Sequence, residues 1–272
     1  MMSIRRFTYI AACILIISSA DAHELQFEAT PTLRIVTSEE PPTNYFSSEG
    51  ALVGTTVDIV EEIKKRLLLD VEIEVMPWAR SYTMAKKWSN IVIFTAGRTE
   101  ERVNHGFHFI GPVMTRKHIL WAKPKTKFNI RSIDDIKNME LRLGAMRGDW
   151  REKYFRDRGM EVESVTNHKQ NFRKLINGRI DLWVLSDIGA PPTVKKLGAS
   201  MKDIQVSYVF KTAPSYIMLS KDMPKSAVED WKRAYADIKK TDFFSKTAKK
   251  WSSILDLELA YSEELGLFVN QQ

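Results

Sequence analysis

The sequence predicts an α/β fold of two lobes, in which each lobe is a mainly parallel sheet flanked by helices. Short β-rich runs alternate with segments of helical periodicity, and this alternation occurs twice along the chain. Extended stretches at His118 to Lys123 and Tyr216 to Ser220 bracket the second occurrence. We therefore expect one lobe to interrupt the other, with two extended segments joining them.

The first occurrence begins with a β-rich run at Leu33 to Thr37, followed by a polar loop that contains proline. Thr56 to Leu68 then carries apolar residues at helical spacing. A strand, a helix and a strand follow in that order: Val71 to Val75, Ala79 to Trp88 and Ile91 to Thr95. This order implies parallel strands with helices on both faces of the sheet.

The second occurrence repeats the order strand, helix, strand, helix, strand. Its elements are Leu141 to Ala145, Arg151 to Arg158, Val162 to Val165, Asn171 to Ile176 and Ile180 to Leu185. Gly159 and Gly178 stand where the two helices are expected to end. The second lobe therefore has the same parallel arrangement as the first.

The C-terminal part of the chain returns to the first lobe. Helices are expected near Lys225 to Lys239 and Asp242 to Trp251. We assign residues 23–120 and 216–272 to lobe I, and residues 121–215 to lobe II. A mature chain of about 250 residues is long enough to bury the cores of two such lobes.

Residues 1–22 have the order of a secretory signal peptide. Arg5 and Arg6 precede an uncharged apolar run, Phe7 to Ile17, and small residues end the segment at Ala20-Asp21-Ala22. We expect cleavage after Ala22 and a soluble protein in the periplasm. An uncleaved anchor is the alternative, but the apolar run is much shorter than the ~20 residues that span a bilayer.

Cys13 is the only cysteine, so the mature chain can form neither a disulfide nor a thiolate site. Lipid attachment at Cys13 would leave about six apolar residues before it, fewer than a signal peptide usually has. Removing two arginines and one aspartate from 41 basic and 34 acidic residues leaves 39 and 33, a net charge of +6. Because the lysine pairs are dispersed among acids at helical spacing, we expect solvated helix faces and no nucleic-acid partner. We also expect a monomer.

No set of residues points to hydrolysis, metal chemistry or nucleotide binding. The chain has no Gly-rich phosphate loop and no GxSxG motif. His105 and His108 form an HxxH pair, but no third ligand is evident, so ordinary positions at the protein surface are favoured over a metal site. We therefore predict no catalytic residue, no metal and no cofactor.

Charged residues follow two of the expected strands, where ligands bind in open α/β sheets. Arg102 lies in the segment after the strand Ile91 to Thr95, and its guanidinium can hold a carboxylate bidentately. Asp187 follows the strand Ile180 to Leu185 and can hold an ammonium group. The structural alternatives are an internal ion pair for Arg102 and a helix N-cap for Asp187.

Further candidate ligand contacts lie beside these two charges or at equivalent loop positions. They are Thr95 and Gly97, and Asp149 and Trp150. The last two follow Gly148, which lets backbone N–H groups approach an anion at the start of the next helix.

Five sequence segments, in order and spacing, resemble the family 3 extracellular solute-binding proteins, the polar amino-acid receptors of ABC importers. They are residues 33–37, 52–60, 98–102, 133–137 and 177–181, and the resemblance covers nearly the whole mature length. It implies a type II periplasmic-binding-protein fold with a ligand cleft between the lobes. It also implies that Arg102 binds the α-carboxylate of the ligand, Asp187 its α-amino group, and Trp78 packs against it. The structural alternative for Trp78 is a buried aromatic residue at a strand end.

The chain departs from that family at several cleft positions. Gly97 replaces a hydroxyl residue, Arg98 replaces an apolar one, Ser38 stands near the position where the family has an acid, and Arg80 adds a cation beside the aromatic. These departures predict a more positive cleft. Such a cleft suits a ligand with more than one acidic group, or one that is not an α-amino acid.

The resulting expectation is a periplasmic substrate-binding protein, not an enzyme, that captures a small polar or charged solute in the cleft. The solute is an amino acid or a small carboxylate, and the partner is the membrane permease of an ABC importer. One alternative is a ligand-sensing partner of a membrane sensor kinase. Another is a dehydratase-like enzyme on the same fold, which is disfavoured because only Asp187 and Glu39 are plausibly placed as acids or bases.

Overall fold

The computed structural model describes residues 32–270. The expected signal peptide, its cleavage site after Ala22 and Cys13 lie outside the described residues. Within the described part, no helix has the length and apolar character needed to cross a membrane. The described residues form an α/β structure in which helices pack on a curled mixed sheet.

Two groups of parallel strands form the ends of this sheet. The first group is β4 (Ile73–Val75), β1 (Arg34–Thr37) and β5 (Ile91–Gly97), and the second is β9 (Leu182–Ser186), β7 (Leu143–Met146) and β8 (Val162–Val165). In both groups the chain passes from strand to helix to strand, as the sequence predicted. Parallel strands require such crossovers, and the burial of nearly all of β5 and β9 is typical of strands covered on both faces.

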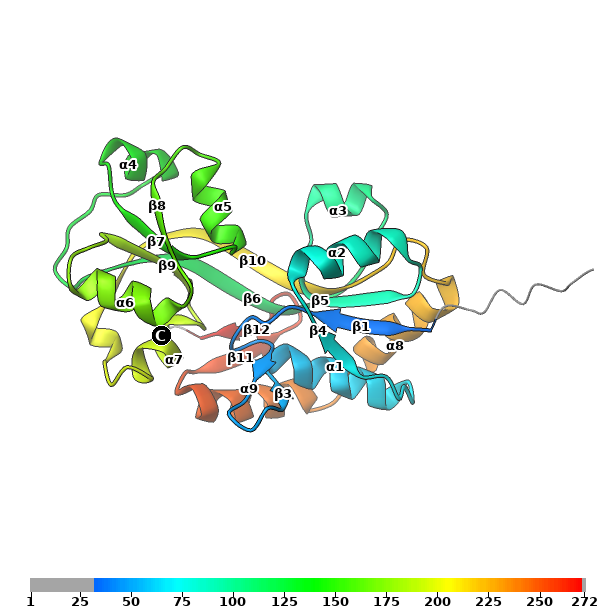
Figure 1. Cartoon of the computed structure of the whole chain (residues 1–272). Helices are drawn as coiled ribbons and strands as arrows, with labels where there is room; N and C mark the ends of the chain where they lie inside the picture. The colour runs from blue at the N-terminus through cyan, green and yellow to red at the C-terminus, as the bar shows by residue number, and fades with distance from the viewer. Residues whose placement is uncertain (1–31, 271–272) are drawn as a thin grey trace, which may run out of the picture. The chain divides into compact units, whose positions relative to one another are not determined.

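Two long antiparallel strands join the groups, so the sheet is continuous from β4 to β8 (Figure 1). They are β6 (His108–Ala122) and β10 (Gln205–Leu219), which pair along most of their length. Each contains one of the extended stretches expected from the sequence, but each is much longer than that stretch. β10 pairs with β5, and β6 pairs with β9.

Helices cover both groups of strands. On the first group these are α1 (Thr55–Arg66), α2 (Trp78–Lys87), α3 (Glu100–Asn104), α8 (Lys225–Lys239) and α9 (Phe243–Leu255). On the second they are α4 (Ile133–Asn138), α5 (Trp150–Arg156), α6 (His168–Ile176), α7 (Ala190–Lys195) and the 3₁₀ turn η1 (Met201–Asp203). Gly159 and Gly178 follow α5 and α6 with φ angles of 73° and 69°, which confirms them as helix-ending glycines.

Several elements had no clear signal in the sequence. The short helices α3, α4 and α7 and the turn η1 were not expected, and neither were two hairpins. The hairpins are β2 (Tyr45–Phe46) with β3 (Leu52–Val53), and β11 (Leu259–Ser262) with β12 (Gly266–Val269). The unexpected helices and the turn have three to six residues, fewer than two turns at 3.6 residues per turn, which is too short to display helical periodicity.

The apolar core is divided in the same way as the strands. Two clusters form around β1, β5, α1, α8 and α9, with Phe94, Trp231 and Trp251 among their largest buried side chains. Two others form around β7, β9, α5 and α6, with Phe155 and Trp183 at their centres. Separate cores on the two strand groups are what a two-lobed fold requires.

Candidate functional site

The loop after β1 carries Glu40 and is held tightly to the ends of two strands. Glu40 N–H donates to the Asn44 carbonyl at 2.7 Å, and Thr43 Oγ1 donates to the Glu40 carbonyl at 2.5 Å. Asn44 is fully buried, where its Nδ2 donates to Thr37 Oγ1 at 3.0 Å and its Oδ1 accepts from Thr95 Oγ1 at 2.6 Å. The carboxyl ends of β1 and β5 therefore hold this loop in one conformation.

Thr95 and Gly97 are the last residues of β5 rather than part of a loop after it. The strand ends two residues later than the sequence indicated because β10 pairs with it through Ser215 and Gly97. Thr95 has a φ of 61°, which is unusual for a β-branched residue and costs conformational energy. Its hydrogen bond to Asn44 helps to hold this conformation at the strand end.

Arg102, on the short helix α3, folds back over the end of β5. Its Nη1 donates to the Gly97 carbonyl at 2.6 Å, and its guanidinium carbon lies 4.8 Å from the Trp78 ring centre and 5.1 Å from that of Tyr82. Burial lowers the pKa of Arg102, but an arginine so placed remains charged. The internal ion pair that was the structural alternative is not its main contact; a carbonyl and two aromatic rings hold it instead. The structure thus brings Arg102, Gly97 and Trp78 together.

Arg80 and Arg98 are not part of this group. Arg80 is exposed on α2, two residues from Trp78, and side chains at that spacing do not share a helix face. The charge of Arg80 helps to lower the pKa of Glu74, although it contributes less than Arg34 does. Arg98 lies 5.8 Å from the Phe109 ring centre and lines a groove of about 310 Å³ beside α3.

On the second strand group, Asp149, Trp150 and Arg151 begin helix α5. Asp149 caps the helix by accepting from Arg151 N–H, and its carboxylate holds the Arg151 guanidinium through contacts of 2.8 and 2.6 Å. This ion pair lowers the pKa of Asp149 although burial acts in the opposite direction. Trp150 packs edge-on against His118 of β6 with ring centres 4.7 Å apart.

Glu40 meets two arginines that the sequence did not single out. Its Oε1 lies 2.6 Å from Arg116 Nη1, on β6, and 3.3 Å from Arg151 Nη2. Both arginines are buried, and the Glu40 side chain is 23% exposed. Glu40, and not its exposed neighbour Glu39, is thus the acid that the β1 loop presents to this region.

Asp187 lies at the end of β9, next to the crossing strand β6. Its buried carboxylate accepts from the N–H groups of Lys117 at 3.1 Å and Ile188 at 2.8 Å. Burial raises the pKa of Asp187, while those two hydrogen bonds and the charges of Arg116 and Lys117 act against the rise. The N-cap of α7 is Gly189, so Asp187 does not take the helix-capping role.

The four histidines among residues 32–270 are of two kinds: the surroundings of two keep them neutral, and the other two contact backbone carbonyls. Burial and the neighbouring Arg151 and Arg116 strongly lower the pKa of His118, and burial lowers that of His168 to about 4. His105 Nδ1 contacts the Glu101 carbonyl and His108 Nε2 the Lys221 carbonyl. Among residues 32–270, no cluster of three His, Cys, Asp or Glu side chains has a geometry that could hold a metal ion.

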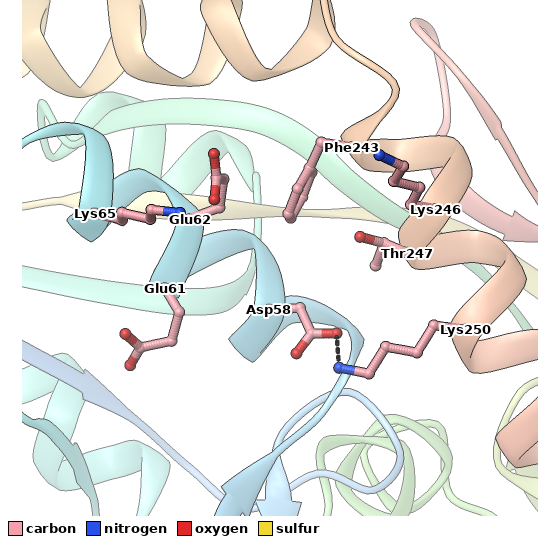
Figure 2. Close-up of a pocket in the computed structure, with 8 residues that line it drawn as sticks. All are labelled: Asp58, Glu61, Glu62, Lys65, Phe243, Lys246, Thr247 and Lys250. Atoms are coloured by element: carbon pink, nitrogen blue, oxygen red, sulfur yellow. Dashed lines mark hydrogen bonds and ion pairs between the residues drawn. The ribbon is translucent and has the colours of Figure 1, made fainter.

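A larger groove, of about 590 Å³, lies elsewhere, between α1 and α9 (Figure 2). Acidic side chains of α1 and basic side chains of α9 line it, and Lys250 Nζ bonds Asp58 Oδ2 at 2.7 Å. None of its lining residues belongs to the groups around Arg102, Glu40 or Asp187. We place the candidate site at those three groups, because the charged and aromatic residues converge there at strand ends.

The fold consists of two groups of parallel strands that two long crossing strands join. Charged side chains lie at the carboxyl ends of both groups, where α/β folds bind ligands. These features define a two-lobed solute-binding fold. Residues 33–254 match the family model of the bacterial extracellular solute-binding proteins, family 3. The chain belongs to this family. This confirms the resemblance and the fold that the sequence predicted.

Individual relatives agree with this assignment. The L-cystine-binding protein TcyA of Bacillus subtilis (strain 168) is 21% identical over 213 residues, which are 78% of this chain and 77% of that protein. An ancestral arginine-binding protein bound to arginine is 25% identical, with a TM-score of 0.65 over 81% of this chain and 97% of that one. A histidine kinase sensor domain with similarity to periplasmic binding proteins shares the fold at 15% identity, with a TM-score of 0.67 over 80% and 95% of the two chains.

Proposed function

We propose that this chain is a periplasmic substrate-binding protein that captures an amino acid or small carboxylate and delivers it to the permease of an ABC importer. Its membership of family 3 supports the binding role. The observation that carries the proposal is the position of Arg102, which is held by Gly97 and Trp78 at the carboxyl end of β5. A charged group fixed in this way is suited to bind a ligand carboxylate without reorganising.

The lobes in this proposal are residues 23–120 with 216–272, and residues 121–215. Arg102 and Thr95 then belong to lobe I and Asp187, Asp149 and Trp150 to lobe II. Strands β10 and β6 lie between β5 and β9 in the sheet, so the two strand ends are about three strand spacings, or about 14 Å, apart across the sheet. They are also offset along β6 from Met114 to His118, or by about 13 Å. Closure of the two lobes would bring Arg102 to the carboxylate and Asp187 to the ammonium group of one small solute.

The nature of the solute is proposed from the relatives. Proteins that bind L-cystine and arginine are similar to this chain, so both amino acids belong in the first ligand panel. The buried Asp187 supports a ligand with an amino group, because a nearby cation would offset the cost of burying its charge. We propose that the protein acts as a monomer.

We propose that the chain is not an enzyme. General acid or base catalysis needs a titratable group that reaches the reacting atoms. Asp187 is held by two backbone N–H groups, Glu40 by two arginines and Asp149 by Arg151. These contacts suit charge recognition. A histidine kinase sensor domain shares the fold, so a sensor kinase is the alternative membrane partner.

The decisive experiment combines ligand screening with substitution of the arginines. A thermal-shift panel of amino acids, polyamines and small carboxylates identifies a ligand, because binding to the folded state raises the melting temperature. Calorimetry then compares Arg102→Ala with Arg80→Ala and Arg98→Ala. Removing a buried, hydrogen-bonded charge partner costs about 2 to 5 kcal/mol, roughly 30-fold to several thousand-fold in affinity.

The two other arginines are matched controls, because losing an exposed ion pair costs at most about 1 kcal/mol, under roughly sixfold. If folded Arg102→Ala binds within a few-fold of the wild type, Arg102 is not the anchor. If no member of the panel binds, the proposed ligand class is wrong.

A further inference from the structure

Arg116, on the crossing strand β6, carries a buried charge that its contacts among residues 32–270 satisfy only in part. It is only 6% exposed, and its Nε has no hydrogen-bond partner among residues 32–270. The hydrogen bond that the structure gives its side chain is from Nη1 to Glu40 Oε1. A guanidinium has five N–H groups, and leaving buried ones without acceptors costs free energy.

The neighbouring Arg151 is different, because Asp149 already neutralises it. Asp149 contacts the Arg151 guanidinium through both carboxylate oxygens, and Glu40 adds only a longer contact of 3.3 Å. The carboxylate of Glu40 is therefore principally the counter-charge of Arg116. It approaches Arg116 through one oxygen, where a bidentate carboxylate would satisfy more of the guanidinium.

Arg116 also lies near the proposed ligand-binding groups. In the sheet, Arg116 is opposite Ala213 of β10, two residues before Ser215, which is opposite Gly97 of β5. Two strand spacings, about 10 Å, therefore separate its strand from the strand end that holds Arg102. Its charge also acts on Asp187. Arg116 thus lies between the two proposed ligand-binding groups.

We propose that Arg116 is a second oxyanion anchor for the ligand, and that a ligand carboxylate competes with the Glu40 side chain for it. The solute would then carry an acidic group in addition to the carboxylate that Arg102 binds. This inference rests on the proposed function and names its ligand class. Glu40 is suited to exchange because its side chain is partly exposed, whereas its backbone is fixed by Asn44 and Thr43.

The first test asks whether an external carboxylate can replace Glu40. Glu40→Ala removes the internal carboxylate, and sodium acetate is the probe, with sodium chloride at equal concentration and acetamide as controls. Saturating acetate should raise the melting temperature of Glu40→Ala by about 2 to 4 °C more than chloride does. The wild type and the double variant Glu40→Ala/Arg116→Gln should show no such difference. An equal response of all three proteins to acetate overturns the proposal, and so does no response in Glu40→Ala.

The second test uses Glu40→Gln, which keeps the size of the side chain and so guards against misfolding. L-Glutamate and L-glutamine are the probes because they differ in one negative charge. Glu40→Gln should bind glutamate several times more tightly than the wild type does, and its affinity for glutamine should be little changed. Arg116→Gln should lower glutamate affinity by about 30-fold or more.

These results separate the inference from the proposed function. If the wild type binds an amino acid from the panel but Glu40→Gln does not prefer glutamate, the solute-binding role stands and the second anchor is wrong. If no amino acid binds any variant, the proposed function fails as well, whatever acetate does.

Discussion

The guanidinium of Arg102 lies over the ring of Trp78, with 4.8 Å between the guanidinium carbon and the ring centre. Trp78 begins α2 directly after Pro77, and Arg102 lies on α3 after β5. The two residues therefore come from different crossovers of the same strand group. The aromatic face of Trp78 orients the cation. The attraction in such a cation–π pair is about 0.5 to 2 kcal/mol when the pair is desolvated.

Trp78→Leu should weaken ligand binding by roughly 2-fold to 30-fold, because Arg102 loses this orientation. Trp88→Leu is the matched control, since Trp88 lies at the end of the same helix with Arg34 over its ring at 5.6 Å. Calorimetry with the amino acid that binds the wild type measures both. Equal losses in the two variants would show that Trp78 contributes only to the general stability of α2.

Ligand binding should make the molecule more compact, because β6 and β10 are the connections between the strand groups and can act as a hinge. Small-angle X-ray scattering with and without saturating ligand measures this change. An unchanged radius of gyration, with binding confirmed by calorimetry, would argue for a rigid pocket and against lobe closure.

Asn44→Ala should lower the free energy of unfolding by about 1 to 3 kcal/mol, because the buried Thr95 hydroxyl loses its acceptor and the buried Thr37 hydroxyl loses the amide that donates to it. Urea denaturation measures the loss. Asn129→Ala is the control: Asn129 is exposed, so its replacement should stay within about 0.5 kcal/mol. A small effect at Asn44 would mean that this network does not hold the Glu40 loop.

Stability should fall as the pH decreases from about 6.5 to about 4, partly through His168. Burial lowers its pKa from 6.5 to about 4, and Trp183 Nε1 donates to its Nδ1 at 3.3 Å, which requires the neutral ring. Because the folded pKa is depressed, the unfolded chain binds the proton first, and stability is lost as the pH falls through this window. The difference between the unfolded and folded pKa values of His168 corresponds to at most about 3 kcal/mol of folding free energy for this half-buried group.

His168→Gln should therefore lose less stability than the wild type between pH 7 and pH 4, as measured by urea denaturation at several pH values. The strongly lowered pKa of His118 acts in the same direction in both proteins. His105→Gln, at an exposed position, is the control. Parallel curves for the wild type and His168→Gln would contradict the assignment.

Asp58 links α1 to α9 through Lys250, as Figure 2 shows, and also through Trp251. It should contribute to stability through Trp251 more than through Lys250. Its Oδ2 accepts from both side chains at 2.7 Å, but Trp251 is almost fully buried whereas Lys250 is exposed. Asp58→Ala should cost about 1 to 3 kcal/mol by leaving a buried indole N–H without a partner. Lys250→Ala should cost under about 1 kcal/mol. Thermal unfolding of the two variants compares them, and equal costs would contradict this account.

The sequence alone was sufficient for the class of fold and the order of the main elements, and it named candidate residues for one half of the site. The strand Val162–Val165 and the helix Lys225–Lys239 have the predicted bounds, because local periodicity records which face of an element is buried. Arg102, Gly97 and Asp187 were candidates because they follow strands, where α/β folds place ligands. Trp78 was a candidate because the resembling family places an aromatic residue at that position.

Only the tertiary structure decided the other half of the site. Glu40 meets Arg116 across 76 positions in the chain and Arg151 across 111, and no local pattern marks any of the three. The length of β6 and β10 was also set by pairing with each other rather than by their own composition. The physical reason is that the periodic pattern of buried residues depends only on residues that are close in sequence. An ion pair depends on how distant segments approach, and that is settled only when the strands and helices pack.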